Sequence, residues 1–227
     1  MNLSALSKAI AGYRPKLPQS LRKGALNVQV EKGEATQSIK DQAKIQEIFP
    51  HTYGAPIVRF NEGKSAEPKA LIIGVVLSGG QAPGGHNVIA GIFDGVKSIH
   101  SESQVFGFKG GPSGLEEGDY LEITSEVIDQ YRNTGGFDII GSGRTKLEST
   151  EQFDRCAEVV VNEKIDAIVI IGGDDSNTNA AVLAEYFKAQ NVPCSVVGAP
   201  KTIDGDLKNK YVETSFGFDT AAKTFAE

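Results

Sequence analysis

Apolar and polar positions follow two different patterns along the chain. From residue 70 onward, short continuous apolar runs alternate with segments whose apolar residues recur every three or four positions. The runs predict strands buried on both faces, and the recurring positions predict amphipathic helices. This alternation predicts a doubly wound, mostly parallel α/β sheet with helices on both faces. The predicted strands cover 71–77, 104–108, 137–140, 167–171 and 194–197, and the predicted helices cover about 86–99, 153–160 and 180–187.

Residues 1–69 lack this alternation. Leu3, Leu6 and Ile10 have helical spacing, and a second helix is predicted over about 37–48. Prolines break the stretches after each helix, because a proline disfavours helix in the residue before it. We therefore predict a mainly helical N-terminal extension that wraps on the α/β core rather than forming an independent domain.

Composition narrows the class of protein. Of the 227 residues, 40% are apolar and 23% are charged, and the formal net charge is -6. This acidic balance argues against broad binding to nucleic acid or to an anionic membrane, which needs clustered positive charge. The two cysteines, Cys156 and Cys194, are too far apart in sequence to suggest a zinc site or a disulfide scaffold. With no apolar run of membrane-spanning length and no secretory signal pattern, the expected location is the cytoplasm.

A glycine-rich turn follows the first predicted strand, in the stretch Leu77-Ser78-Gly79-Gly80-Gln81-Ala82-Pro83-Gly84-Gly85. Glycines let a ligand approach the backbone closely, and the helix that follows presents unpaired N–H groups at its N-terminus. This geometry suits a phosphate, although the standard dinucleotide and P-loop fingerprints are absent. A tight connection between strand and helix that binds no ligand explains the glycine-rich turn equally well.

Two adjacent carboxylates follow another predicted strand, in Gly172-Gly173-Asp174-Asp175-Ser176. A helix cap by Asp175 or Ser176 would explain one of these polar residues. A hard cation such as Mg²⁺, held between carboxylate and phosphate oxygens, would explain both acids and is favoured.

A third polar turn follows the last predicted strand and contains Lys201, Thr202, Asp204 and Asp206. A carboxylate can take the proton of a substrate hydroxyl, while an ammonium stabilises charge on a transferring phosphoryl group. By itself this turn reads as an ordinary polar surface loop. Because the carboxyl ends of parallel strands meet at one edge, three such turns together favour phosphoryl transfer.

These loops together resemble the phosphofructokinase family, and most closely its long pyrophosphate-dependent members. The resemblance rests on the first glycine turn, on Gly141-Ser142-Gly143-Arg144, on Gly172-Gly173-Asp174-Asp175-Ser176 and on Pro200-Lys201-Thr202-Ile203-Asp204-Gly205-Asp206. It implies reversible transfer of phosphate between pyrophosphate and the 1-hydroxyl of fructose 6-phosphate, with Mg²⁺ as cofactor. It also implies that residues 70–227 form the domain that binds the donor phosphate and Mg²⁺.

The resemblance also assigns roles to single residues. Asp174 would associate with Mg²⁺, and Asp204 would accept the proton of the sugar hydroxyl, supported by Asp206. Lys201 would stabilise the transferring phosphate. The residues implied on the donor side are Gly79, Gly80, Arg144, Asp175 and Ser176, and those implied at the sugar phosphate are Thr202, Ile203 and Asp204.

Two positions bear on the choice of donor. The resemblance places glycine in ATP-dependent members where this chain has Asp175 and Lys201. A carboxylate at position 175 would repel the α-phosphate of a nucleotide, which favours pyrophosphate. An ATP-dependent sugar-phosphate kinase and a non-catalytic regulatory subunit remain the alternatives.

The family's Met-Gly-Arg motif for the sugar phosphate is absent from this sequence. We therefore expect the chain to be an N-terminal portion with an incomplete acceptor site. The expected partners are pyrophosphate, fructose 6-phosphate, and either a second copy in a dimer or a chain that carries the missing half.

Overall fold

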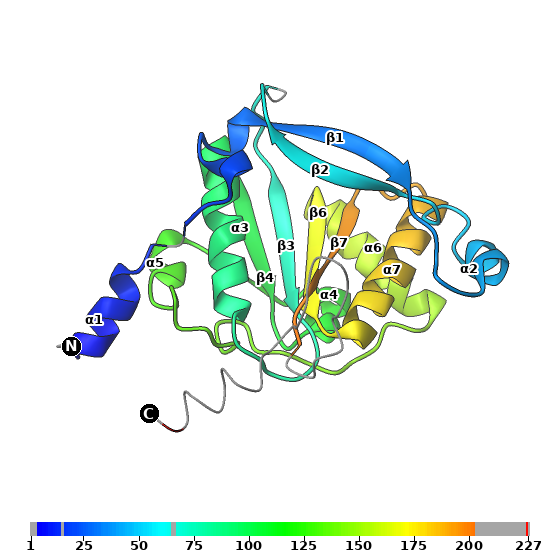
Figure 1. Cartoon of the computed structure of the whole chain (residues 1–227). Helices are drawn as coiled ribbons and strands as arrows, with labels where there is room; N and C mark the ends of the chain where they lie inside the picture. Colours follow the sequence, from blue (N-terminus) through cyan, green and yellow to red (C-terminus); the bar gives the residue numbers. More distant parts are fainter. Residues whose placement is uncertain (1–3, 15, 65–66, 203–225, 227) are drawn as a thin grey trace.

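The computed structural model describes residues 4–14, 16–64, 67–202 and 226 (Figure 1). A five-stranded sheet forms its centre, in the order β5-β4-β3-β6-β7. β3 (Ile72–Leu77), β4 (Gln104–Phe108), β6 (Ala167–Gly172) and β7 (Ser195–Pro200) run parallel, and the short β5 (Tyr120–Glu122) pairs antiparallel with β4. The predicted mostly parallel α/β sheet is confirmed.

Helices cover both faces of the sheet, so the central strand is buried on both sides. Ile73, Val75 and Leu77 of β3 pack in the cluster that contains residues of α3 (Gly85–Ile99) and α5 (Ser125–Ile128). Val76 faces the opposite cluster, built with α4 (Pro112–Glu117), α6 (Thr150–Asn162) and α7 (Asp174–Ala189). This double burial explains why β3 reads as an unbroken apolar run.

The start of α6 is stabilised by local side-chain chemistry. Ser149 and Gln152 form a reciprocal capping box at the start of α6, in which each side chain bonds the backbone of the other. The predicted helices at 86–99, 153–160 and 180–187 correspond to α3, α6 and α7. The structure adds α4, β5 and α5, which the apolar periodicity did not indicate because each is six residues or shorter.

The prediction of a strand at 137–140 is wrong, because these residues form a turn. Phe137, Ile139 and Ile140 are buried in the cluster on the α3 face. Both edges of β3 are already paired with β4 and β6, so this apolar segment packs by its side chains without joining the sheet. An apolar run alone does not separate these two modes of burial.

Both helices predicted in the extension exist, as α1 (Ala5–Gly12) and α2 (Gln42–Ile48). The prediction did not include strands there. The extension also contains two short 3-10 turns and an antiparallel ribbon of β1 (Val28–Ala35) and β2 (Pro56–Glu62), which crosses the end of the sheet opposite the glycine turns (Figure 1). Nearly all ribbon residues are exposed, so burial imposes no alternating pattern on their sequence. Across the described residues, no helix is both long and apolar enough to cross a membrane.

Candidate functional site

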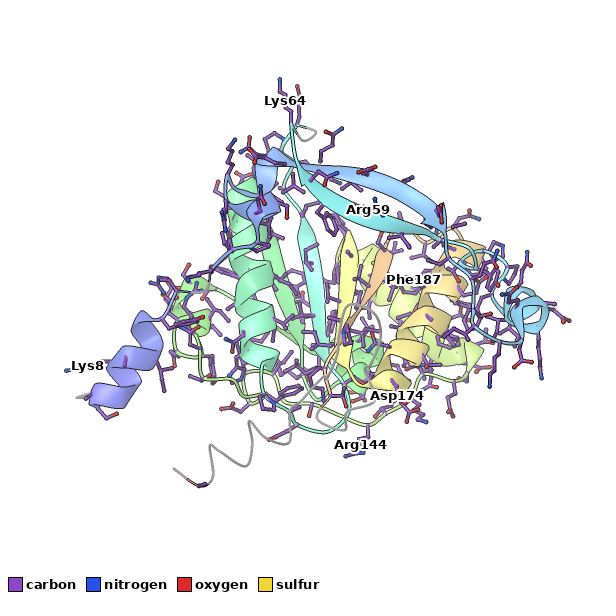
Figure 2. The ribbon with its side chains drawn as sticks, in the orientation of Figure 1. Lys8, Arg59, Lys64, Arg144, Asp174 and Phe187 are labelled. Atoms are coloured by element: carbon purple, nitrogen blue, oxygen red, sulfur yellow. The ribbon has the colours of Figure 1, made fainter. Side chains whose placement is uncertain are left out.

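The glycine turn and the 141–144 loop meet at the carboxyl edge of the sheet. The Ser78 N–H donates to the Ile171 carbonyl at 2.8 Å, and the Gly79 N–H donates to the Gly143 carbonyl at 2.8 Å. Gly143 also forms an isolated parallel bridge with Ser78. Figure 2 shows Arg144 and Asp174 at this same edge of the molecule.

Two glycines make this close approach possible. Gly79 has φ +87, a left-handed conformation that favours glycine, and a Cβ there would lie 3.5 Å from the Ser176 hydroxyl oxygen. A Cβ at Gly111 would lie 2.5 Å from the backbone nitrogen of Gly143. The Gly110-Gly111 turn therefore packs directly against the loop that carries Arg144.

A hollow of about 220 Å³ lies between these loops and the start of α7. Ser78 and Ser176 line it, with only 5% and 8% of their surfaces exposed. Within the part of the chain that the structure describes, neither serine hydroxyl has a hydrogen-bond partner. A buried polar group without a partner is rare, and a bound ligand is one way to satisfy it. The other lining residues are Gly79, Arg144, Thr145, Lys146, Asp175 and Asn179.

The acidic residues of the second turn lie in the first turn of α7. The helix begins after Gly173, and no side chain forms a cap bond there, so the alternative that Asp175 or Ser176 caps the helix is wrong. Asp174 and Asp175 are both exposed. Anionic groups at a helix N-terminus are stabilised by the helix dipole, which accounts for the tolerance of two adjacent acids here.

Basic side chains surround the same edge. A Cβ on Gly80 would lie 3.0 Å from the Arg144 guanidinium, so this cation lies against the glycine turn. The Lys146 ammonium lies 3.5 Å from Asp175 Oδ2. A flexible, exposed ion pair of this kind leaves both side chains able to meet a ligand.

Lys201 connects the third turn to the other two. Its N–H donates to the Gly172 carbonyl at 2.8 Å, and its ammonium donates to the Gly80 carbonyl. The ammonium also lies 4.9 Å from the centre of the Phe137 ring, within cation–π range. The structure thus brings a cation from the end of β7 onto the glycine turn at the end of β3.

The structure assembles most of the predicted donor-side residues. Gly79, Arg144, Asp175 and Ser176 line the hollow, and Gly80 and Lys201 contact each other beside it. Asp174 is adjacent but does not line the hollow, and Thr202 is partly buried next to Lys201. The predicted residues Ile203, Asp204 and Asp206 lie outside the described residues.

Sequence reasoning missed Ser78, Thr145, Lys146 and Asn179, which also line the hollow. Asn179 holds the loop in place, because its side chain accepts from the Leu147 N–H at 3.1 Å and donates to the Leu147 carbonyl at 2.6 Å. Lys146 was detectable in sequence as a second cation two residues after Arg144. Asn179 was not, because its contact with Leu147 is long-range.

The donor set at this edge fits a hard cation. No three His, Cys, Asp or Glu side chains gather as a metal site among the residues described. Mg²⁺ in phosphate-transferring sites is commonly held by one or two carboxylates together with substrate phosphates. The exposed carboxylate of Asp174, next to the hollow lined by the buried hydroxyls of Ser78 and Ser176, is compatible with that arrangement.

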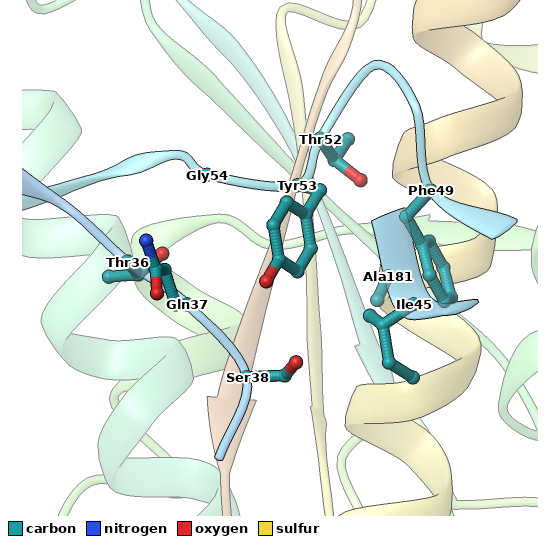
Figure 3. Close-up of a pocket in the computed structure, with 9 residues that line it drawn as sticks. All are labelled: Thr36, Gln37, Ser38, Ile45, Phe49, Thr52, Tyr53, Gly54 and Ala181. Atoms are coloured by element: carbon teal, nitrogen blue, oxygen red, sulfur yellow. The ribbon is translucent and has the colours of Figure 1, made fainter. Parts of the chain in front are cut away.

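A second hollow, of about 330 Å³, lies between the extension and α7 (Figure 3). Ile45 and Phe49 lie beside Ala181 of α7, while Thr36 and Ser38 form its polar side. None of the residues in the three polar turns lines it. We therefore place the candidate site at the carboxyl edge of the sheet.

An open, mostly parallel sheet whose strand ends gather glycine turns around a hollow is the architecture of α/β proteins that bind phosphorylated ligands. Comparison with known proteins defines this class further. The phosphofructokinase family matches residues 72–227. The chain belongs to the phosphofructokinase family.

Individual relatives support this assignment. Pyrophosphate--fructose 6-phosphate 1-phosphotransferase of Porphyromonas gingivalis is 56% identical over 100% of this chain and 41% of that protein. The beta subunit of the same-named enzyme of Solanum tuberosum is 54% identical over 81% of this chain and 33% of that protein. The structure of phosphofructokinase from Saccharomyces cerevisiae superposes with a TM-score of 0.55 at 22% identity, over 69% of this chain and 20% of that one, which shows a shared fold. The chain spans about two fifths of the length of the first curated relatives that it matches.

Proposed function

We propose that this chain provides the donor-binding part of a phosphotransferase that moves a phosphoryl group from pyrophosphate to the 1-hydroxyl of fructose 6-phosphate, with fructose 1,6-bisphosphate and phosphate as products. The observation that carries the proposal is the pair of buried hydroxyls of Ser78 and Ser176 in the hollow at the carboxyl edge, which have no hydrogen-bond partner among the described residues. Phosphate oxygens would satisfy both. The relatives' names supply the substrates, and the hollow supplies a place for the phosphate.

In this proposal the donor phosphates lie against the backbone of Gly79 and Gly80. Arg144, which packs on Gly80, clamps a phosphate with two parallel N–H groups. Ser78 and Ser176 donate to phosphate oxygens in the hollow. Phosphoryl transfer needs little covalent chemistry from the protein, so positioning and charge stabilisation carry most of the catalysis.

Lys201 supplies the charge stabilisation. Its ammonium already lies at the glycine turn through its bond to the Gly80 carbonyl, so it needs little movement to reach a transferring phosphate. Asp175 at the rim of the hollow disfavours the α-phosphate of a nucleotide, which supports pyrophosphate rather than ATP as donor.

The remaining roles are proposed from the family resemblance. Asp204, supported by Asp206, would take the proton of the sugar hydroxyl, and Thr202, Ile203 and Asp204 would line the sugar-phosphate site. Asp174 would hold Mg²⁺, which supplies a counter-charge for the phosphates when bound. Residues 70–227 would form the domain that carries these groups, with residues 1–69 as its extension.

The partners and location are proposed on the same basis. Plant relatives are named as alpha and beta subunits, which supports an assembly of several chains. A homodimer, or pairing with a chain that carries the rest of the acceptor site, follows from this. We propose the cytoplasm as the location.

The test is a coupled assay for fructose 1,6-bisphosphate with Mg²⁺ and fructose 6-phosphate, offering pyrophosphate or ATP in turn. With the chain assembled with the part that completes the acceptor site, we expect turnover with pyrophosphate and none with ATP. Turnover with ATP alone would show that Asp175 and Lys201 do not select the donor. Calorimetric titration with pyrophosphate in parallel separates donor binding from catalysis, and the absence of any binding heat would contradict the donor site itself.

A further inference from the structure

The further inference concerns Lys146, which lies in the hollow but has no role in the proposed reaction. Lys146 and Asp175 form an ion pair, with 3.5 Å between Nζ and Oδ2. Their side chains are 56% and 79% exposed, so the pair contributes little to the stability of the fold. Because both residues line the hollow, the charges of the pair instead act on the binding of a charged ligand there.

The backbone around Lys146 is held on both sides. Gly143 bonds to the glycine turn through the Gly79 N–H, and the buried Leu147 is clamped at both backbone atoms by Asn179. The loop between them has little freedom to move away from α7. Lys146 is therefore presented to the first turn of α7 by contacts that are independent of the ion pair itself.

The negative charge of Asp175 would weaken the binding of pyrophosphate unless a nearby cation compensates it. A carboxylate at the rim of the hollow repels a nucleotide, but it also repels pyrophosphate, which carries a similar density of negative charge. Lys146 lies where it neutralises that carboxylate, and a neutralised Asp175 still occupies space beside the hollow. Pyrophosphate is small enough to avoid that space, whereas a donor that continues beyond its second phosphate meets it.

We propose that Lys146 is a donor-specificity residue, which acts through Asp175 by compensating its charge so that the hollow accepts pyrophosphate. The inference rests on the proposed function, because it takes pyrophosphate as the ligand of this hollow. Lys146 is a positioning residue in this proposal, and Asp175 is the group through which it acts.

The experiment measures the dissociation constant of pyrophosphate with Mg²⁺ by isothermal titration calorimetry on the 227-residue chain. Lys146→Gln should weaken binding at least about tenfold, equal to about 1.4 kcal/mol. The double variant Lys146→Gln with Asp175→Asn should recover most of that loss, because the uncompensated carboxylate is gone. Lys69→Gln is the matched control, since it removes an exposed lysine paired with Asp166 at 3.0 Å near the opposite ends of the strands.

The single variant Asp175→Asn completes the cycle and separates compensation from direct contact. Compensation predicts that Lys146→Gln costs little affinity once Asp175 is Asn, whereas a lysine that binds pyrophosphate directly costs the same in both backgrounds. An equal cost in both backgrounds overturns the inference. A Lys146→Gln variant that binds within twofold of the parent overturns the inference, and so does a loss that the double variant fails to recover. If the parent chain itself does not bind pyrophosphate, the proposed function fails as well. The two failures are thus distinguished by the parent titration alone.

Discussion

Glu185 of α7 joins the N-terminal extension to the α/β core, and its removal makes a quantitative test of that joint. Its carboxylate is 12% exposed and accepts from the His51 and Thr52 N–H groups, each at 2.9 Å, and from the Thr52 hydroxyl at 2.7 Å. His51 Nδ1 lies 2.5 Å from the same carboxylate. One side chain thus satisfies both backbone donors of a turn that lies more than a hundred residues away in sequence.

The Glu185→Ala variant leaves those donors without their partner. A hydrogen bond contributes about 1 kcal/mol net, and somewhat more to a charged group. Because water can reach this turn, we expect a total loss of about 2 to 3 kcal/mol in the free energy of unfolding rather than the full sum of charged bonds. For a chain of this size, that loss lowers Tm by roughly 4–12 °C.

Urea denaturation measures the loss in the free energy of unfolding of the whole chain. Amide hydrogen exchange across residues 42–62 measures whether the extension has been released from the core. Glu158→Ala is the control, because Glu158 is an exposed glutamate on α6 with no ion pair among the described residues. Glu185→Gln keeps one acceptor oxygen, so its loss in the free energy of unfolding should lie between those of Glu185→Ala and Glu158→Ala. A loss below about 0.5 kcal/mol with unchanged exchange would refute the reasoning, since it would place the joint elsewhere.

The same contact predicts a pH dependence. Burial raises the pKa of Glu185, but hydrogen bonds from Thr52 and His51 outweigh burial and hold the pKa below its ordinary value of 4.5. A carboxyl with a depressed folded-state pKa contributes stability above its unfolded pKa and loses it as pH falls through the folded value. Docking of the extension should therefore persist at neutral pH and weaken below about pH 4.5, and Glu185→Ala should remove that acid-dependent step.

Four further predictions follow from the site and the core. Lys201→Ala should lower turnover with pyrophosphate about 100-fold or more in the coupled assay, and unchanged turnover would remove Lys201 from the mechanism. Asp175→Gly should permit measurable ATP binding by calorimetry, and no gain would show that Asp175 does not select the donor. Burial lowers the pKa of His86, opposed by Asp138, so stability should fall as pH drops below 6.5, and His86→Gln should flatten that slope in urea titrations at pH 5 and pH 7. Burial raises the pKa of the Cys156 thiol to about 12, so this thiol should resist a disulfide reagent at pH 8 until urea unfolds the chain, and rapid labelling of the folded chain would contradict its burial.

The sequence predicted much of the donor side of the site because most of its residues follow strands, although Arg144 follows the buried turn at 137–140. Gly79, Arg144, Asp175 and Ser176 occur at or near the ends of segments that tertiary folding brings to one edge. The parallel sheet makes that convergence a general rule. Asn179 escaped prediction because its role depends on which loop packs against which helix turn. The pairing of Lys146 with Asp175 escaped for the same reason, since no local pattern encodes such a contact.

The sequence by itself determined the parallel sheet and its longer helices. β3 and β6 are buried on both faces, and α3, α6 and α7 on one, so burial leaves a period in the sequence that local reasoning can detect. The ribbon of β1 and β2 is exposed and leaves no such period, and the turn at 137–140 is buried without pairing. Only the tertiary structure decided the conformation of the ribbon and of this turn. The same holds for the contact of Glu185 with the extension and for the ion pair of Lys146 with Asp175. Each depends on the free energy of contacts between distant segments, which exists only once the chain has folded.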